Sequence, residues 1–207
     1  MYKIPYYTEA DTEKVFAFMQ QHPFAIITGA GDHYPVATHV PVAISRDAAG
    51  KIILSGHIMR KSDHHLAFEK NPEVLVIFNG PHCYVSASWY TTPVMGSTWN
   101  YMTVHAKGKI RFTGEAGTRA AVRAVTERFE GTESVSAFDK LPGQYVDQMV
   151  KAITGFHIEV ETLENVFKLS QNRDKASQEN IIAQLRARAD EASHSIAAEM
   201  ELRLLHS

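Results

Sequence analysis

The sequence predicts a mainly β protein with flanking helices, folded as a closed or split β-barrel. Six or more short stretches have the alternating pattern of antiparallel strands, and few stretches have helical spacing. A barrel suits this pattern because curling a sheet onto itself removes exposed strand edges. The 207 residues are 44% hydrophobic and 21% charged, which is typical of a globular protein with a sizeable core.

The longest predicted strand covers residues 99–112. Its alternation assigns one face to the core: Met102, Val104, Ala106, Ile110 and Phe112. The other face mixes large rings, hydroxyls and cations: Trp99, Tyr101, Thr103, His105, Lys107, Lys109 and Arg111. A solvated face rarely needs a Trp and a Tyr together, so we expect this face to meet a planar ligand. A dimer interface without a ligand is the alternative.

The first third of the chain predicts one helix and three strands. Residues 8–11 resemble a capping box, and the helical spacing that follows stops at Pro23. Strands are expected at 24–28, 34–44 and 51–58, with a hairpin turn at 47–50, as an antiparallel meander. Pro35 and Pro41 cannot donate hydrogen bonds, so parts of the second strand should lie at a sheet edge.

The middle of the chain alternates short strands and helices. Ser62 is placed to cap a short helix that ends before Pro72. The predicted strands cover 73–78, 82–88, 156–161 and 166–169, with a turn at 79–80. Residues 114–117 should break the pattern, a helix should end at Gly131, and another should cover 145–153.

The composition shifts to small and charged residues after Lys175. An apolar stripe at rough helical spacing predicts two helices broken near Asp190: Ile181, Ile182, Leu185, Ile196 and Met200. We expect a binding domain over residues 1–173 and a helical tail over 174–207 that packs on the barrel or on a partner subunit.

Charge and cysteine usage exclude several classes of protein. The net charge of −2 gives no general attraction to nucleic acid or anionic lipid. Cys83 is the only cysteine, so no intrachain disulfide can form and a reducing compartment is expected. The first five residues have no apolar signal region, and no apolar run is long enough to span a bilayer. We therefore expect a cytoplasmic protein.

Two cations between a predicted strand and a predicted helix suggest a phosphate site. Arg60 can bind two phosphate oxygens at once, and Lys61 adds a point charge next to the capping Ser62. Asp63 argues against this interpretation, because a carboxylate there would compete with the phosphate. A solvated turn is the alternative.

The 11 histidines are not arranged as a metal motif. Any one of four could ligate a metal or haem, but each is more often a hydrogen-bonding residue of a half-buried strand: His39, His57, His82 and His105. The sequence holds no cysteine cluster, no Gly-x-Ser-x-Gly elbow and no Walker-type or dinucleotide fingerprint. We therefore expect no metal site.

Four stretches of sequence resemble the PaiB-like FMN-binding negative transcriptional regulators. They are His57-Ile58-Met59-Arg60, the residues 79–90, the residues 98–108 with their Trp-Asn-Tyr block, and the Lys-Leu-Ser-Gln-Asn-Arg block at 168–173. The resemblance runs from the amino terminus to the helical tail. It implies an FMN-binding split β-barrel, usually dimeric and related in fold to pyridoxamine phosphate oxidases, with the flavin in a groove between two subunits.

The resemblance also implies a set of cofactor-binding residues. Arg60 and Lys61 would hold the FMN phosphate, near His57 of the first motif. The flavin ring or ribityl chain would be lined by Ser86, Ser88, Trp99, Asn100 and Tyr101, and the site would be completed from the same or the other subunit by Lys168, Gln171 and Arg173. The family often has a small uncharged run where this chain has Lys61-Ser62-Asp63-His64-His65.

Three functional hypotheses follow. The first is a dimeric flavin-binding protein with a regulatory or sensing role, although the sequence shows no helix-turn-helix for direct DNA binding. The second is an FMN-dependent oxidoreductase acting on a small substrate, with His105 or Tyr101 moving protons. The third is a haem-binding split barrel.

Overall fold

The computed structural model describes residues 1, 4–92 and 95–205. Its elements, in chain order, are η1 (Pro5–Tyr7), α1 (Thr12–Gln21), β1 (Phe24–Gly29), β2 (Val36–Pro41), β3 (Ala43–Arg46), β4 (Ile52–Met59), α2 (Asp63–Lys70), β5 (Glu73–Val85), η2 (Ala87–Trp89), β6 (Thr98–Phe112), α3 (Glu115–Glu130), η3 (Phe138–Lys140), α4 (Gly143–Ala152), β7 (Ile153–Lys168), α5 (Lys175–Arg186) and α6 (Glu191–Leu205). Within the described residues, no helix combines the length and apolarity needed to cross a membrane.

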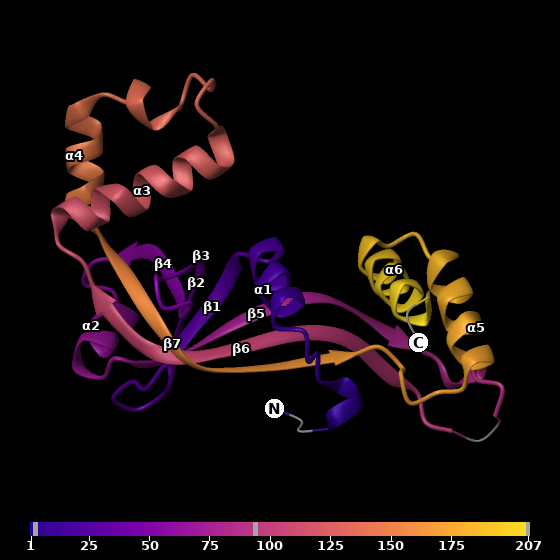
Figure 1. Ribbon diagram of the computed structural model, residues 1–207. Helices are drawn as coiled ribbons and strands as arrows, with labels where there is room; N and C mark the ends of the chain where they lie inside the picture. Colours follow the sequence, from indigo (N-terminus) through magenta and orange to yellow (C-terminus); the bar gives the residue numbers. More distant parts are fainter. Residues whose placement is uncertain (2–3, 93–94, 206–207) are drawn as a thin grey trace. The chain divides into compact units, whose positions relative to one another are not determined.

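The chain divides into two compact units. Unit 1 consists of residues 1–18, 79–104 and 164–207, and unit 2 consists of residues 19–78 and 105–163. The strands β5, β6 and β7 each continue from one unit into the other, so both units are built from segments far apart in the sequence. Figure 1 shows the elements and their order along the chain.

The strands form one sheet with the order β2-β1-β5-β6-β7-β4-β3. The pairs β1–β2, β1–β5, β3–β4 and β4–β7 are antiparallel. The end strands β2 and β3 are consecutive in the sequence, because β2 ends at Pro41 and β3 begins at Ala43. Only Val42 separates them, so the two edges of the sheet must approach each other there. The sheet curls without closing its hydrogen-bond ladder, as the predicted split β-barrel requires.

Within unit 2, Val42 holds the edge strands β2 and β3 close to each other. Its side chain is 2% exposed, and its backbone N–H donates to the carbonyl of Pro23 over 2.9 Å. The antiparallel pairings predicted for the meander are present, but its middle strand is divided. Residues 34–44 are two strands at opposite edges, because the backbone at Val42 bonds to Pro23 instead of continuing one ladder. The expectation that Pro41 lies at an edge is confirmed.

The predicted turn at 79–80 is absent, because these residues lie inside β5. Strand β7 runs without a break through residues 164–165, so it joins the two strands predicted at 156–161 and 166–169. Gly80 packs in unit 1, where a Cβ would collide with the ring of Phe18 at 2.6 Å. This glycine is needed for a close approach within a strand, so its role is packing rather than turning.

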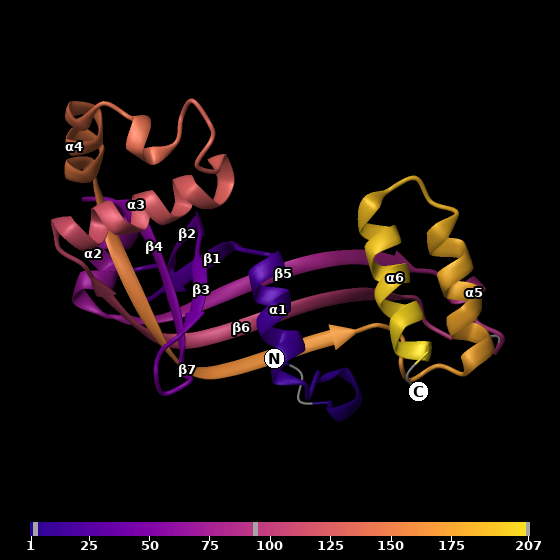
Figure 2. The ribbon, with the colours of Figure 1, turned by 45° about the horizontal axis from the view of Figure 1, so that its top comes forward.

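In unit 2, helices α3 and α4 form a helical excursion, that is, an insertion in the chain between strands β6 and β7 (Figure 2). The strand pattern ends at Phe112, as the predicted break requires, and helix α3 begins at Glu115, inside residues 114–117. The predicted helix end at Gly131 is confirmed by a φ of 74° there. The excursion has a small core of its own: Val122, Phe138, Val146, Val150 and Ile153. Arg123 lies over the Phe138 ring and pairs with Asp139.

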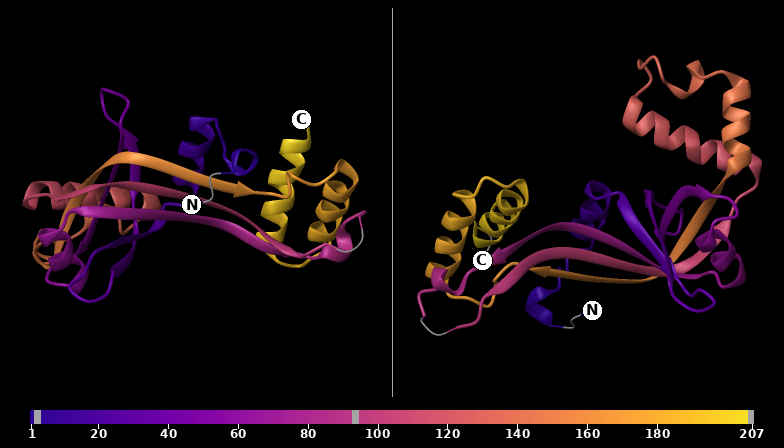
Figure 3. Two further views of the ribbon diagram at one scale, coloured as in Figure 1. Left: turned by 90° about the horizontal axis from the view of Figure 1, so that it is seen from below. Right: turned by 180° about the vertical axis from the view of Figure 1, so that it is seen from behind.

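Unit 1 ends in the predicted pair of helices. The ends of β5, β6 and β7 run side by side toward α5 and α6 (Figure 3). The Asp190 side chain accepts from the backbone N–H of Ser193 where the second helix begins, and Arg186 and Glu201 pair across the two helices at 2.6 Å. The apolar residues predicted for this tail are all buried: Ile181, Ile182, Leu185, Ile196 and Met200.

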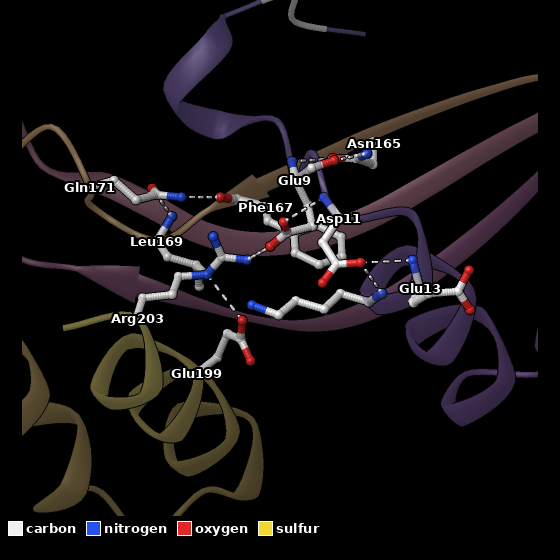
Figure 4. A network of polar contacts seen from close by, with 10 residues as sticks. Glu9, Asp11, Glu13, Asn165, Phe167, Leu169, Gln171, Glu199 and Arg203 are labelled. Carbon is white, nitrogen blue, oxygen red and sulfur yellow. Dashed lines mark hydrogen bonds and ion pairs between the residues drawn. The ribbon is translucent and has the colours of Figure 1, made fainter. Parts of the chain in front are cut away.

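The N-terminal segment of unit 1 is attached to α6 and β7 by polar contacts (Figure 4). Arg203 pairs with Glu9 at 2.6 Å and with Glu199 at 3.0 Å, and Asn165 bonds the backbone of Glu9 through both its amide atoms. The predicted cap at Thr8 is wrong. Asp11 is the residue that accepts from the first backbone N–H groups of α1.

Candidate functional site

The predicted cofactor residues fall into two groups, one in each unit. His57, Arg60 and Lys61 belong to unit 2. The other eight belong to unit 1: Ser86, Ser88, Trp99, Asn100, Tyr101, Lys168, Gln171 and Arg173.

In unit 2, Arg60 and Lys61 lie in the junction between β4 and α2. The backbone N–H of Arg60 donates to the carbonyl of Ala152 over 3.0 Å, which anchors the junction. Lys61 has a φ of 60°, a left-handed conformation that costs a residue with a side chain about 1–2 kcal/mol. Within the described part of the chain, neither cation forms an ion pair. Their charge therefore remains available to an anion.

Ser62 begins α2 as the sequence predicts. Its hydroxyl accepts from the backbone N–H of His65 over 3.3 Å, and helix starts favour negative charge. Asp63 does not compete for Arg60, since its carboxylate accepts from both the backbone N–H and the ring Nδ1 of His64. These hydrogen bonds lower the pKa of Asp63. The second ring nitrogen of His64 lies 2.9 Å from the Ser62 hydroxyl.

His57 lies on β4, before the junction. Its ring is half-buried, and burial lowers its pKa. The buried Nδ1 atom has no hydrogen-bond partner within the described residues. A neutral ring with one free nitrogen can accept or donate one further hydrogen bond.

In unit 1, Trp99 lies on an exposed aromatic patch of β5 and β6. The Trp99 side chain is 53% exposed, and its ring lies 6.1 Å from the rings of both Tyr84 and His82. Tyr101 follows two positions along β6 and is half-buried. This arrangement confirms the predicted alternation of the strand, with Met102 and Val104 buried on the opposite face.

Ser86 and Ser88 lie at the end of β5, where η2 begins. Their hydroxyls are 2.8 Å apart, and the Ser86 hydroxyl also accepts from the backbone N–H of Ser88. The segment is fixed to α5, because Asn180 donates to the carbonyl of Trp89 and Thr91 bonds both Asp174 and Ser177.

Asn100 and Gln171 hold the turn that follows β7. The buried Asn100 side chain accepts from the Ser170 hydroxyl over 3.0 Å and donates to the sulfur of Met200. Gln171 bonds the backbone of Phe167 and Leu169 through its amide. Ser170 has a φ of 61°, so the turn is strained and is held by these side chains. Asn100 and Gln171 therefore position their neighbours.

The residues that this turn presents are Lys168 and Arg173. The guanidinium of Arg173 lies 4.3 Å from the centroid of the Tyr90 ring, and the ammonium of Lys168 lies 5.8 Å from that of Tyr7. Burial, and then the charge of Arg173, lower the pKa of Lys168. Sequence reasoning missed Tyr7 and Tyr90, because their contacts with the cations depend on segments that meet only in the fold.

The residues of unit 2 fit the phosphate of FMN. Two unpaired cations flank a capped helix start, and the carboxylate that could have neutralised them is bonded to His64. In residues 1, 4–92 and 95–205, no group of three potential His, Cys, Asp or Glu ligands occurs. The fold and these residues together define an FMN-binding split barrel.

Comparisons with known proteins agree with that class. Residues 1–162 match the family described as "Putative FMN-binding domain", so this chain belongs to that family and FMN is its cofactor. The chain is 30% identical to Protease synthase and sporulation protein PAI 2 of Bacillus subtilis (strain 168), over 99% of this chain and 98% of the relative. The predicted resemblance to the PaiB-like proteins is thereby confirmed.

Solved structures share the fold at low sequence identity. The flavocytochrome Anf3 from Azotobacter vinelandii has a TM-score of 0.62 and 14% identity, covering 81% of this chain and 72% of that one. The FAD and heme binding protein from Mycobacterium smegmatis has a TM-score of 0.60 and 17% identity, covering 86% and 80%. These similarities support the split-barrel architecture.

Proposed function

We propose that this flavoprotein works as a cytoplasmic homodimer in which FMN has a regulatory or sensing role. The regulatory part is supported by the similarity, along nearly the whole chain, to a relative named as a sporulation protein. The cytoplasmic part is supported by Cys83, a buried free thiol. FMN supplies one- and two-electron redox chemistry when bound, which would let such a protein respond to the redox state of the cell.

The observation that carries the assignment of the phosphate is Arg60, which lies in the junction before α2 and has no ion-pair partner among the described residues. In this proposal Arg60 binds two phosphate oxygens and Lys61 adds a weaker charge interaction. The Trp99 face, with the rings of Tyr84 and His82 beside it, would form the dimer contact.

The test compares FMN with riboflavin, which has the same ring and no phosphate. Arg60→Ala should weaken FMN binding more than about tenfold and leave riboflavin binding nearly unchanged, because truncating one partner of a charged hydrogen-bonded pair costs about 2–5 kcal/mol. Lys61→Ala should have a smaller effect of the same kind. Calorimetric titration of both ligands measures the difference.

A matched control is Arg111→Ala. Arg111 is also an arginine of unit 2, but it is exposed on β6 and lies 3.8 Å from Glu159. This variant should bind both ligands normally. Equal losses of FMN and riboflavin in Arg60→Ala would show that Arg60 supports the fold or the ring instead of the phosphate.

Haem is the competing ligand, since some proteins of this fold are named for haem binding. The absorbance spectrum of the purified protein separates the two. We expect flavin bands and no haem Soret band, and a Soret band retained through purification would contradict the proposal.

A further inference from the structure

Unit 1 contains a second pair of cations with no counter-charge. Within the described residues, neither Lys168 nor Arg173 forms an ion pair with a carboxylate. Both side chains are half-buried. Like charges held near each other in a partly desolvated place are unfavourable unless an anion joins them. This arrangement is costly for a structural role, because one nearby Asp or Glu would relieve it.

The pair is held in place by five separate segments. Lys168 ends β7, and its ammonium donates to the hydroxyl of Thr98 at the start of β6. Tyr7 comes from η1 and Tyr90 from the segment after η2. Arg173 follows the strained turn that Asn100 and Gln171 hold. The charge of Arg173 acts on Lys168 across this turn, and backbone strain of the kind seen at Ser170 is often found at binding sites.

Donor groups remain available on both cations. One guanidinium nitrogen of Arg173 contacts the sulfur of Met95 over 3.1 Å, and its plane lies over the Tyr90 ring. An arginine has five N–H donors, and the described residues provide no oxygen acceptor for the Arg173 guanidinium. The Lys168 ammonium has three donors, of which Thr98 takes one. Together they match an oxyanion with two or three oxygens.

A further unsatisfied group lies beside the pair. The Tyr90 hydroxyl is buried and has no hydrogen-bond partner in the described part of the chain, and the Tyr90 side chain as a whole is 8% exposed. Such a group costs about 1–3 kcal/mol unless a ligand or water meets it. Among the described residues, the cluster therefore contains a hydroxyl without a hydrogen-bond partner in addition to two cations without an ion-pair partner.

We infer that Lys168 and Arg173 form a second anion site, which binds the carboxylate or phosphate of a small molecule other than FMN. The inference rests on the proposed assignment of the FMN phosphate to Arg60. The ligand would be a small carboxylic acid or phosphate ester. Its binding would allow the flavoprotein to respond to a second small molecule in addition to FMN.

Two methionines report on the two sites separately. Met95 contacts Arg173, and Met59 directly precedes Arg60 and is 58% exposed. The full chain is labelled with ¹³C at the methionine methyl groups, and the Met59→Leu and Met95→Leu variants assign the two signals. Inorganic phosphate is then titrated into the flavin-free and the FMN-saturated protein.

The inference predicts a specific pattern. In the flavin-free protein, phosphate should shift both methyl signals. In the FMN-saturated protein, Met59 should no longer respond, while the Met95 signal should respond with nearly unchanged affinity. If the Met95 response is lost with FMN bound, Lys168 and Arg173 belong to the flavin and the second site is refuted. An absence of any Met95 response to phosphate also refutes it.

Variants test the two cations. Lys168→Met and Arg173→Gln should each weaken the Met95 response at least about tenfold, since a hydrogen bond to a charged group is worth about 1.5–3 kcal/mol. Lys168→Arg keeps the charge and should retain the response, which excludes a general folding defect. Lys175→Met removes an exposed cation of the same unit and should change nothing.

If the assignment of the FMN phosphate to Arg60 is wrong, the titration gives a different result from the one that refutes the second site. If FMN does not use Arg60, the Met59 signal keeps its phosphate response in the FMN-saturated protein. The Met95 response still decides the second site in that case.

Discussion

The hydroxyl of Ser170 donates to the Asn100 side chain over 3.0 Å, and both residues are buried although they lie 70 positions apart. This hydrogen bond joins β6 to the strained turn after β7. Because the turn carries Lys168 and Arg173, the bond links the packing of unit 1 to its cationic site.

Breaking this bond should destabilise the protein and disturb the turn. Asn100→Leu leaves the Ser170 hydroxyl buried without an acceptor, which should lower the free energy of unfolding by about 1–3 kcal/mol. Adding Ser170→Ala should recover part of the loss, with a coupling energy of about 0.5–3 kcal/mol in a double-mutant cycle from urea unfolding. Ser134→Ala removes a hydroxyl whose two hydrogen bonds lie at the protein surface, so it should have a smaller effect. Additive effects at Asn100 and Ser170 would show that their bond is unimportant.

The exposed aromatic patch should form the dimer contact. We expect no monomer in sedimentation at micromolar concentration, because Trp99 at 53% exposure and Tyr84 at 43% lie together on one surface. Trp99→Glu should favour the monomer. Tyr34→Glu alters an aromatic residue that is 83% exposed and should leave the dimer intact. A monomeric wild type with bound flavin would contradict the proposal.

Direct reading of DNA should be weak or absent. The chain has a net charge of −2, so little affinity from phosphate contacts is expected. Titration of promoter fragments at physiological salt should give no tight, site-selective complex with the isolated protein. A selective complex would show that the regulatory role is exerted on DNA directly.

Cys83 should make stability fall in alkaline solution. Burial raises the pKa of its thiol from 9.0 to about 11. Below pH 9 the thiol is protonated in both states. Between pH 9 and about 11 the unfolded chain loses this proton while the folded chain keeps it, so the folded state loses up to about 2–3 kcal/mol.

Urea unfolding across this pH range measures the effect. Tyrosines and lysines also titrate there, so the comparison is with Cys83→Ala, which should show a shallower fall between pH 9 and 11. Identical slopes for the two proteins would mean that the Cys83 thiol does not contribute.

Local patterns in the sequence predicted those elements that local chemistry determines. The cap at Ser62, the helix end at Gly131 and the two faces of β6 were predicted correctly, because each depends on neighbouring residues. The division of residues 34–44 at Val42 was missed, since it depends on a hydrogen bond to Pro23. Gly80 was interpreted as a turn residue because the Phe18 ring that requires it comes from a distant segment.

In the candidate site, too, contacts between distant segments could not be predicted from the sequence. The sequence motifs identified Arg60, Lys168 and Arg173 as candidate binding residues, because a motif and the charge of its side chains can be recognised without the fold. The tyrosines beneath two of these cations were not predicted, as nothing in the local sequence of Tyr7 or Tyr90 indicates a contact with a cation. The sequence likewise could not tell that Asn100 is fully buried.

The pairing of β4 with β7 also affects the order in which the protein can fold during synthesis. The strands β1 to β4 leave the ribosome first, but β4 pairs with β7, which begins only at Ile153. Until then the nascent chain carries strands whose edges lack their final partner. Because such edges promote association between chains, the barrel depends on late completion by its last strand, and a truncation before β7 should leave an aggregation-prone product.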